Sequence, residues 1–391
     1  MHALISGASV AGPVLAHFLS RRGWRVTVVE RAADLRAGDG GHAVDLFGPA
    51  VEVIERMGLL AEVEAARTRN DTITLLRYGK KPITVETADL AAGISARHVE
   101  IMRGTLAGLL HDRTRKDVDY RFGTVITEIH GTVAVLSDGD VISADLIVGA
   151  DGLHSGVRRL AFGPEERFRH FLGAYLAVYT LPDVLGTGPT VAAFTAPGVA
   201  ATVYPTLTPG LSRALFLTRT TEEIPRTRDA IRHLIGDRLG PQVSQVLAHL
   251  DAAGDLYFDD ISQIRMDSWS RGRITLVGDA GYGPGPAVGG GTSLAASGAY
   301  VLASEIAASP DDVPGALRRY ESTMAGPVRH SRKIGPSVLA SIVPRSRAQV
   351  WVTAQVMRLL PRLPQPARAG LTSFGGGPAA MLDGLTLKSS P

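Results

Sequence analysis

Residues 3–13 read ALISGASVAGP, and this stretch decides the fold. Its first four residues form an apolar run typical of a short buried strand. A glycine-rich turn follows, and then a helix that we expect to begin at Pro13 and to end at Gly23. A second apolar run, residues 26–29, ends in Glu30. This order of strand, helix and strand predicts a βαβ unit and hence an α/β fold.

The turn of this unit has the spacing of a dinucleotide-binding motif, with Gly7 and Gly12 in place and Ser9 where a second glycine is usual. In such a motif, backbone N–H groups approach a pyrophosphate at the start of the helix, and an acidic residue ending the second strand binds ribose hydroxyls. Glu30 stands in that place. The motif predicts a dinucleotide site, with an ordinary tight turn as the structural alternative.

A second motif, DGLHSGVR at residues 151–158, follows the apolar strand 146–148. A carboxylate at the carboxyl end of such a strand lies where open α/β sheets bind ligands, so Asp151 is a candidate binding residue. The structural alternative is an aspartate that caps a helix, with Arg158 on the surface. His154 is expected to be a solvated loop residue.

A third motif begins with Gly278-Asp279-Ala280 after the apolar strand 273–277 and continues through Pro286 and Gly289–Gly291 to Thr292. Asp279 is suited to binding ribityl hydroxyls, and the glycines let bare backbone lie against a flat ring. A helix of small residues to about Ala308 would then direct its positive end toward that ring.

The pattern of the remaining chain predicts three regions. Residues 120–140 have the alternation of a β-meander, and residues 166–264 predict antiparallel strands followed by a polar helix at 227–253. The tail after Arg329 is helical in pattern but interrupted by prolines at 336, 344, 361 and 364, and its last fifteen or so residues are expected to be loosely ordered. Apolar spacing at 350–360, near Arg358 and Arg362, fits a domain-capping helix or, as the alternative, a helix on a membrane surface.

The expected domains are discontinuous: a nucleotide-binding domain of residues 1–70, 98–165 and 265–328, a substrate domain of residues 71–97 and 166–264, and a C-terminal helical segment and tail of residues 329–391.

Composition excludes several classes of protein. The formal charge is +3 and the basic residues are scattered, so nucleic acid is a poor partner. The sequence has no cysteine, which excludes disulfides, iron–sulfur clusters and thiolate metal sites and suits the cytoplasm. No metal site is expected. The apolar start lacks the basic region of a signal peptide, and no apolar run is long enough to predict a membrane span.

Taken in order, the three motifs resemble the class A flavoprotein monooxygenases, the family of para-hydroxybenzoate hydroxylase and of tetracycline-inactivating and aromatic polyketide hydroxylases. The likeness covers roughly residues 1–330. It implies a Rossmann-like FAD-binding domain (a mixed sheet with a β-meander), an antiparallel β-sheet substrate domain and C-terminal helices. It also implies non-covalent FAD and NADPH or NADH. The chain departs from the family's Gly-Asp-Ala-Ala-His by having Gly281-Tyr282 in the last two places.

The resemblance also assigns residues. The expected FAD contacts are Gly7, Ser9, Val10, Ala11, Gly12, Glu30, Arg31, Arg36, Arg103, Val125, Asp151, Asp279, Pro286, Gly289, Gly290, Gly291 and Thr292. Arg158 is expected to contact the nicotinamide, and the aromatic residues Phe194, Tyr204 and Phe216 the substrate. No side-chain base is obligatory because the cofactor carries the chemistry. His42 or Arg213 could assist deprotonation of a phenol.

The implied reaction transfers hydride from nicotinamide to flavin, adds O2 as a C4a-hydroperoxyflavin and oxygenates an aromatic or polyketide-like molecule, in antibiotic biosynthesis or modification. Hydroxylation, Baeyer–Villiger insertion and epoxidation share this machinery. A monomer or homodimer is expected. Two alternatives from other classes are a non-oxygenating FAD-dependent oxidoreductase of the same fold and a non-catalytic protein that binds small molecules.

Overall fold

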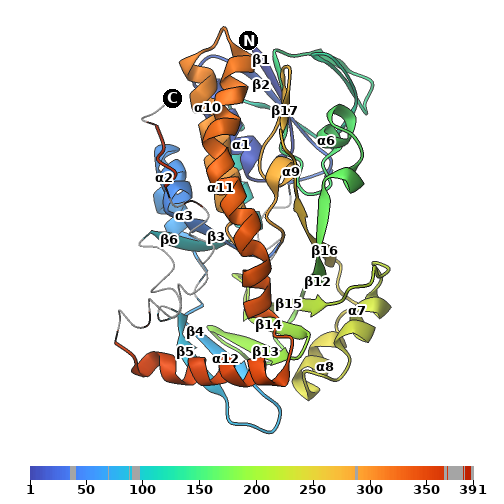
Figure 1. Cartoon of the computed structure of the whole chain (residues 1–391), viewed down its shortest axis with the longest axis vertical. Helices are drawn as coiled ribbons and strands as arrows, with labels where there is room; N and C mark the ends of the chain where they lie inside the picture. The colour runs from blue at the N-terminus through green and yellow to red at the C-terminus, as the bar shows by residue number, and fades with distance from the viewer. Residues whose placement is uncertain are drawn as a thin grey trace.

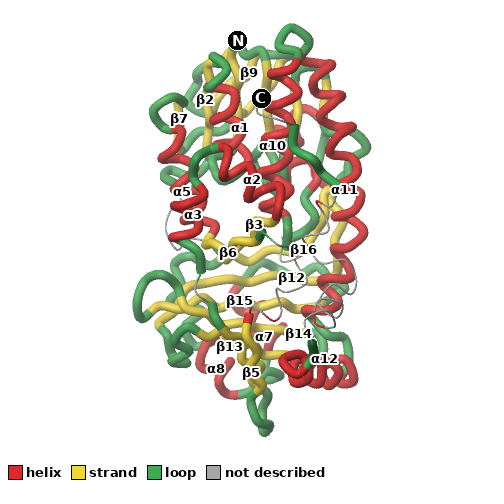
Figure 2. Tube along the Cα trace, turned by 90° about the vertical axis from the view of Figure 1, so that its left-hand side faces the viewer, coloured by secondary structure: helices red, strands yellow, loops and turns green. Residues whose placement is uncertain are grey.

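The computed structural model describes residues 1–35, 41–68, 70–87, 89, 97–286, 289–364, 368, 382 and 384–388. Two large sheets organise this part of the chain (Figures 1 and 2). The six-stranded sheet contains both strands of the βαβ unit and lies in the upper half of Figure 1, and the seven-stranded sheet lies below it. The long helix α11 (Val313–Ile342) runs along both.

Continuous apolar runs form the six-stranded sheet, because its central strands are buried on both faces. All neighbouring strands are parallel except β17 and β18. In the register, Ala3 lies opposite Leu146 and Ile5 opposite Val28. The strands in spatial order are β17 (Ser270–Arg271), β18 (Ile274–Leu276), β11 (Leu146–Gly149), β1 (His2–Ser6), β2 (Arg25–Glu30) and β7 (Asp119–Phe122).

Helices and two small sheets surround the six-stranded sheet. Helix α1 packs against α5 and α10, and α10 also contacts α2 and α11. The helices are α1 (Ala11–Ser20), α2 (Gly48–Arg56), α3 (Leu60–Ala65), α5 (Arg103–Thr114), α6 (Gly156–Ala161), α9 (Asp279–Tyr282) and α10 (Gly291–Ala308), with the 3-10 turn η1 (Glu165–Arg167). The small antiparallel sheets are β8 (Ile126–His130), β9 (Val133–Leu136) and β10 (Val141–Ser143), and β3 (Ala43–Phe47) with β6 (His98–Met102).

The seven-stranded sheet is antiparallel except where β13 pairs with β4. Its strands in spatial order are β16 (Tyr257–Ile264), β12 (Arg169–Pro182), β15 (Leu211–Arg219), β14 (Val199–Pro205), β13 (Thr190–Ala196), β4 (Thr72–Leu76) and β5 (Ile83–Glu86). The predicted fold class, α/β with a largely antiparallel second sheet and C-terminal helices, is confirmed. The domain bounds stay a prediction.

Different helices cover the two faces of the seven-stranded sheet. On one face, alternate side chains pack against α7 (Arg228–Ile235) and α8 (Pro241–Leu247). On the other face, Leu176 and Leu217 pack against the end of α11. The prediction of one helix over residues 227–253 is wrong, because Gly236 and Gly240 take positive φ values of 51° and 90° and break it in two.

The C-terminal helices also differ from expectation. Pro336 does not interrupt the helix: α11 continues through both Pro327 and Pro336 to Ile342, and ends just before Pro344. Packing on both sheets outweighs the lost backbone hydrogen bonds. Helix α12 (Arg347–Leu359) and the short turn η2 (Leu360–Arg362) follow. Most of the last fifteen residues lie outside the described residues. No described helix is long and apolar enough to cross a membrane.

Candidate FAD and active site

The three sequence motifs converge on one cleft of about 400 Å³ at the carboxyl ends of β1, β2, β11 and β18. Glu30, Asp151 and Asp279, which are far apart in the sequence, all line it. In an open α/β sheet this edge is where ligands bind, because the loops after parallel strands meet there.

The first motif forms a tight turn that only glycine fits. Gly7 has a φ of +113°, and a Cβ atom there would lie 2.3 Å from the carbonyl oxygen of Ala150. Glu30 supports the same turn, since its two carboxylate oxygens accept hydrogen bonds from the N–H groups of Ala8 and Ala32, each at 2.9 Å. Helix α1 has no side-chain cap, so its first N–H groups remain available to an anion.

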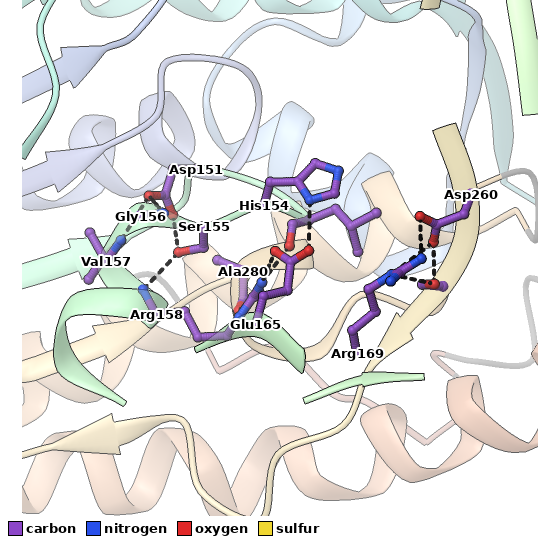
Figure 3. A network of polar contacts seen from close by, with 12 residues as sticks. Asp151, His154, Ser155, Gly156, Val157, Arg158, Glu165, Arg169, Asp260 and Ala280 are labelled. Carbon is purple, nitrogen blue, oxygen red and sulfur yellow. Dashed lines mark hydrogen bonds and ion pairs between the residues drawn. The ribbon is translucent and has the colours of Figure 1, made fainter. Parts of the chain in front are cut away.

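The second motif holds Asp151 by its own loop. Its carboxylate accepts hydrogen bonds from the N–H groups of Gly156 (2.8 Å) and Val157 (3.1 Å) and from the hydroxyl of Ser155 (Figure 3). The hydroxyl of Ser6 donates to the same carboxylate at 3.3 Å. Burial raises the pKa of Asp151, and these hydrogen bonds oppose the shift. Asp151 therefore both fixes the start of α6 and borders the cleft.

The surroundings of Arg158 argue against the predicted contact with a nicotinamide. Its side chain is fully buried and donates to the carbonyl oxygens of Ala280 (2.9 Å) and Leu153 (2.6 Å) and to Glu165 (2.7 Å) (Figure 3). The guanidinium thus connects the second motif to the third through hydrogen bonds. The adjacent Arg159 is exposed and lines the cleft instead.

His154 lies in a turn, as expected, but its side chain is only partly exposed and is paired with carboxylates rather than fully solvated. It lines the cleft and lies between two carboxylates, with Nε2 2.8 Å from Asp259 and Nδ1 2.9 Å from Glu165 (the contact to Glu165 is drawn in Figure 3). The hydrogen bonds to Asp259 and Glu165 raise the pKa of His154 to about 9. A protonated His154 therefore links the second motif to strand β16 of the seven-stranded sheet.

This link makes stability depend on pH. The pKa of His154 in the folded protein lies above its ordinary value of 6.5. Its contribution to the free energy of unfolding is therefore fully present below about pH 6.5 and is lost as pH rises through about 9. We expect the melting temperature of the wild type to fall more steeply, relative to that of His154→Gln, as pH rises through this window. The contribution of His154 to the pH dependence of the unfolding free energy stays below about 1.4 kcal/mol per pH unit, the value for one full proton, because the side chain is partly exposed.

Differential scanning calorimetry from pH 6 to 10 checks this expectation. His17 and His42, whose pKa values burial lowers to about 4 and 3, add a change of opposite sign up to about pH 7.5, where unfolded histidines finish titrating, and this change is the same in wild type and His154→Gln. An equal slope in wild type and His154→Gln would contradict the assignment.

In the third motif, Asp279 faces the cleft between Gly278 and the start of α10. The surrounding protein desolvates its carboxyl group and raises its pKa, while the charge of Arg103 acts in the opposite direction. Helix α10 begins after Gly290, whose φ of +73° is left-handed, and it has no side-chain cap. The positive end of an 18-residue helix is therefore directed at the cleft through Gly291 and Thr292.

Most of the predicted FAD contacts border the cleft: Gly7, Ser9, Val10, Ala11, Glu30, Arg31, Arg103, Val125, Asp151, Asp279, Gly291 and Thr292. Gly12 does not border it, and serves the packing of the turn, since a Cβ atom there would lie 1.9 Å from the carbonyl oxygen of Gly7. Pro286, Gly289 and Gly290 do not border it either, and Arg36 lies outside the described residues.

Phe194 and Phe216 are core residues, and their burial argues against the predicted contact with substrate. Both belong to the cluster under α7 and α8, where they are 2% and 1% exposed. Side chains alternate between the faces of a strand, and the position of each phenylalanine turns it to the helix-covered face.

Tyr204 and Arg213 lie on the opposite face and contact the segment that leads into β3. The Tyr204 hydroxyl accepts a hydrogen bond from the N–H of Ala43 at 3.4 Å, and Arg213 donates from Nε to the carbonyl oxygen of Gly41 at 2.7 Å. The charges of Arg103 and Arg213 add to burial in lowering the pKa of His42. A neutral His42 with a pKa of about 3 is a weak proton acceptor, which argues against the assisting role predicted for it.

One aromatic residue was missed by sequence reasoning. Tyr257, at the start of β16, is 38% exposed and donates a hydrogen bond to Asp259 at 3.3 Å. Burial, the charge of Asp259 and that of Asp279 raise its pKa, while Arg103 acts to lower it. Of these charged groups, Arg103 and Asp279 line the cleft. The run Tyr257-Phe258-Asp259-Asp260 was the only sequence signal, and it resembles any half-buried strand.

Comparisons with known proteins agree with this geometry. The sequence model of the family described as FAD binding domain matches residues 1–325. A flavin-dependent monooxygenase of Legionella longbeachae is 32% identical over 350 residues, covering 87% of this chain and 89% of that protein. Monooxygenase CTB7 of Cercospora beticola is 31% identical over 385 residues, covering 91% of each. The crystal structure of tetracycline destructase Tet(55) superposes with a TM-score of 0.79 at 30% identity, covering 92% of this chain and 96% of that one.

Proposed function

Because this chain belongs to the FAD binding domain family and is a FAD-dependent monooxygenase, we propose that it oxidises a nicotinamide and uses O2 to oxygenate an aromatic or polyketide-like molecule. The observation that supports this most is the convergence of Glu30, Asp151 and Asp279 on one cleft that two uncapped helix starts also face.

The residues that line the cleft suit FAD. The turn at Gly7 and the start of α1 would hold the pyrophosphate, and Glu30 the adenosine ribose. Asp279 would bind ribityl hydroxyls, and the start of α10 would stabilise negative charge on the ring. The bound cofactor supplies a ring that accepts hydride and reacts with O2.

The protein's own part is to orient the partners and to exclude water. Arg158 fixes the carbonyl group of Ala280 beside Asp279, and His154 fixes the second motif to β16. Tyr204 and Arg213 hold residues 41–43 on the side of the seven-stranded sheet away from α7 and α8. We place the substrate between that side and the cleft, near Tyr257 and Tyr204. Arg159 is our candidate for contact with the nicotinamide dinucleotide.

The experiment has two parts. FAD-loaded protein is mixed anaerobically with NADH or NADPH and the bleaching of the flavin absorbance is followed. A panel of polycyclic phenols is then screened under 18O2 for compounds that accelerate nicotinamide oxidation, with mass spectrometry of the products. We expect at least one compound to accelerate oxidation about tenfold or more and to gain one labelled oxygen atom.

Matched variants sharpen this experiment. Tyr257→Phe removes only the hydroxyl next to the cleft, and we expect it to change the KM for the phenol more than the rate of flavin reduction. Phe216→Leu, under α8, serves as the control with both values unchanged. Nicotinamide oxidation that yields only peroxide with every compound would contradict the proposed substrate class, and failure of both nicotinamides to reduce the flavin would contradict the proposed reductant.

A further inference from the structure

Helix α12 has one face on the protein and one face in solvent. Ala354 is buried against Leu75 and Ile83 of the seven-stranded sheet, so the helix caps that end of the sheet. On its outer side, Trp351, Val352, Val356 and Leu359 are 62%, 50%, 37% and 50% exposed. Their spacing of i, i+1, i+5 and i+8 places them on one side of the helix.

Basic side chains border this apolar face. A groove of about 280 Å³ between α12, the β4–β5 turn and the segment before α8 is lined by Arg77, Lys80, Arg238 and Arg347 together with Tyr78 and Trp351. Within the part of the chain that the structure describes, none of these four cations forms an ion pair with a carboxylate. Tyr78 is 82% exposed at the same place.

The sequence around α12 reinforces the charge. Residues 342–364 contain Arg345, Arg347, Arg358 and Arg362 and no aspartate or glutamate, in a chain whose net charge is only +3. All four arginines are exposed. Cations that lie close together without acidic partners repel one another, so the approach of an anionic partner lowers the electrostatic free energy of this surface.

From these observations we propose that the outer face of α12 and its basic groove dock on an anionic lipid bilayer surface. The helix would lie in the plane of the interface, with Trp351 and its aliphatic neighbours among the upper acyl chains and the arginines and Lys80 at the phosphate groups. Charge complementarity favours this occupant over a second copy of the chain, because two copies would bring like charges together. The exposed aliphatic side chains favour it over a nucleic acid.

The location of the face is compatible with catalysis. Helix α12 lies at the end of the molecule that is farthest from the six-stranded sheet, and α1, at the cleft, lies in the other half (Figure 1). Docking there would leave the cleft accessible. The proposal stands apart from the proposed reaction, since it uses none of the cleft residues.

Tryptophan fluorescence provides a direct test. The chain has three tryptophans, and Trp24 and Trp269 are only 6% and 4% exposed, so Trp351 dominates any change in a solvent-sensitive spectrum. FAD-loaded full-length protein is titrated with vesicles of phosphatidylglycerol and of phosphatidylcholine, and co-sedimentation is measured in parallel. We expect a blue shift and co-sedimentation with phosphatidylglycerol that weaken as salt rises, and neither with phosphatidylcholine.

Variants separate the contributions. Trp351→Phe should abolish the blue shift yet still co-sediment, and Arg347→Glu should weaken binding about thirtyfold, since each cation at such a surface is worth about fivefold and the reversal changes two charges. Arg22→Glu, a matched reversal on the exposed turn after α1, should leave binding unchanged apart from long-range effects that salt removes.

Three results would overturn the proposal. They are absence of co-sedimentation with phosphatidylglycerol vesicles at low salt, equal binding to phosphatidylcholine, and equal weakening by Arg22→Glu and Arg347→Glu. A dimer by light scattering that Val352→Glu dissociates, together with no vesicle binding, would assign the face to a second copy instead.

Discussion

A Gly7→Ala variant is expected to lose FAD affinity by at least about a hundredfold. The alanine would have to adopt a φ of +113° and would place its Cβ atom 2.3 Å from the carbonyl oxygen of Ala150. The strain alone is about 1–3 kcal/mol. The clash adds to it and moves the turn away from the pyrophosphate position. The measurement is FAD titration of the apoprotein by flavin fluorescence quenching.

Gly23→Ala is the matched control for this variant. Gly23 lies in the same βαβ unit and also has a positive φ, +77°, but a Cβ atom there would meet nothing within 4 Å. We expect a loss of about 1 kcal/mol in stability and unchanged FAD affinity. If Gly7→Ala bound FAD as tightly as Gly23→Ala, the turn would not be the pyrophosphate site.

Arg158→Met is expected to destabilise the protein by about 3 kcal/mol or more. The substitution keeps the volume of a fully buried side chain but leaves the carbonyl oxygens of Ala280 and Leu153 without their donor and removes a cation from Glu165. Because Ala280 follows Asp279, we also expect weaker FAD binding. Calorimetry of apo and FAD-loaded protein measures both effects.

Arg329→Met is the control, because Arg329 is exposed on α11 and the same chemical change there should cost less than about 0.5 kcal/mol. A melting temperature for Arg158→Met equal to that of Arg329→Met would show that the buried guanidinium does not hold the two motifs together.

Sequence patterns predicted well where a residue acts through its own neighbours in the chain. The turn at Gly7, Glu30 at the end of β2 and the start of α10 all follow from local spacing, because backbone geometry and strand order fix them. Since parallel strands end at one edge of a sheet, Glu30, Asp151 and Asp279, which each follow such a strand, share a cleft.

Local patterns predicted the structure wrongly where contacts with distant parts of the chain determine the position or the burial of a residue. Phe194 and Tyr204 are both aromatic residues in strands of one sheet. Helices α7 and α8 pack against the face that carries Phe194, so that Phe194 is a core residue, whereas Tyr204 lies on the other face beside residues 41–43. Pro336 stays inside α11 because both sheets support that helix.

By itself, then, the sequence determined the α/β class and the three motifs, since these depend on residue types at short spacing, and the cofactor followed from the resemblance of these motifs to a known family. Only the tertiary structure decided that Arg158 is buried, that His154 is a charged link between two carboxylates and that, among the residues described, one side of α12 is exposed. The physical reason is that charge state and exposure depend on groups brought close in space. The partners of His154 are 11 and 105 residues away along the chain.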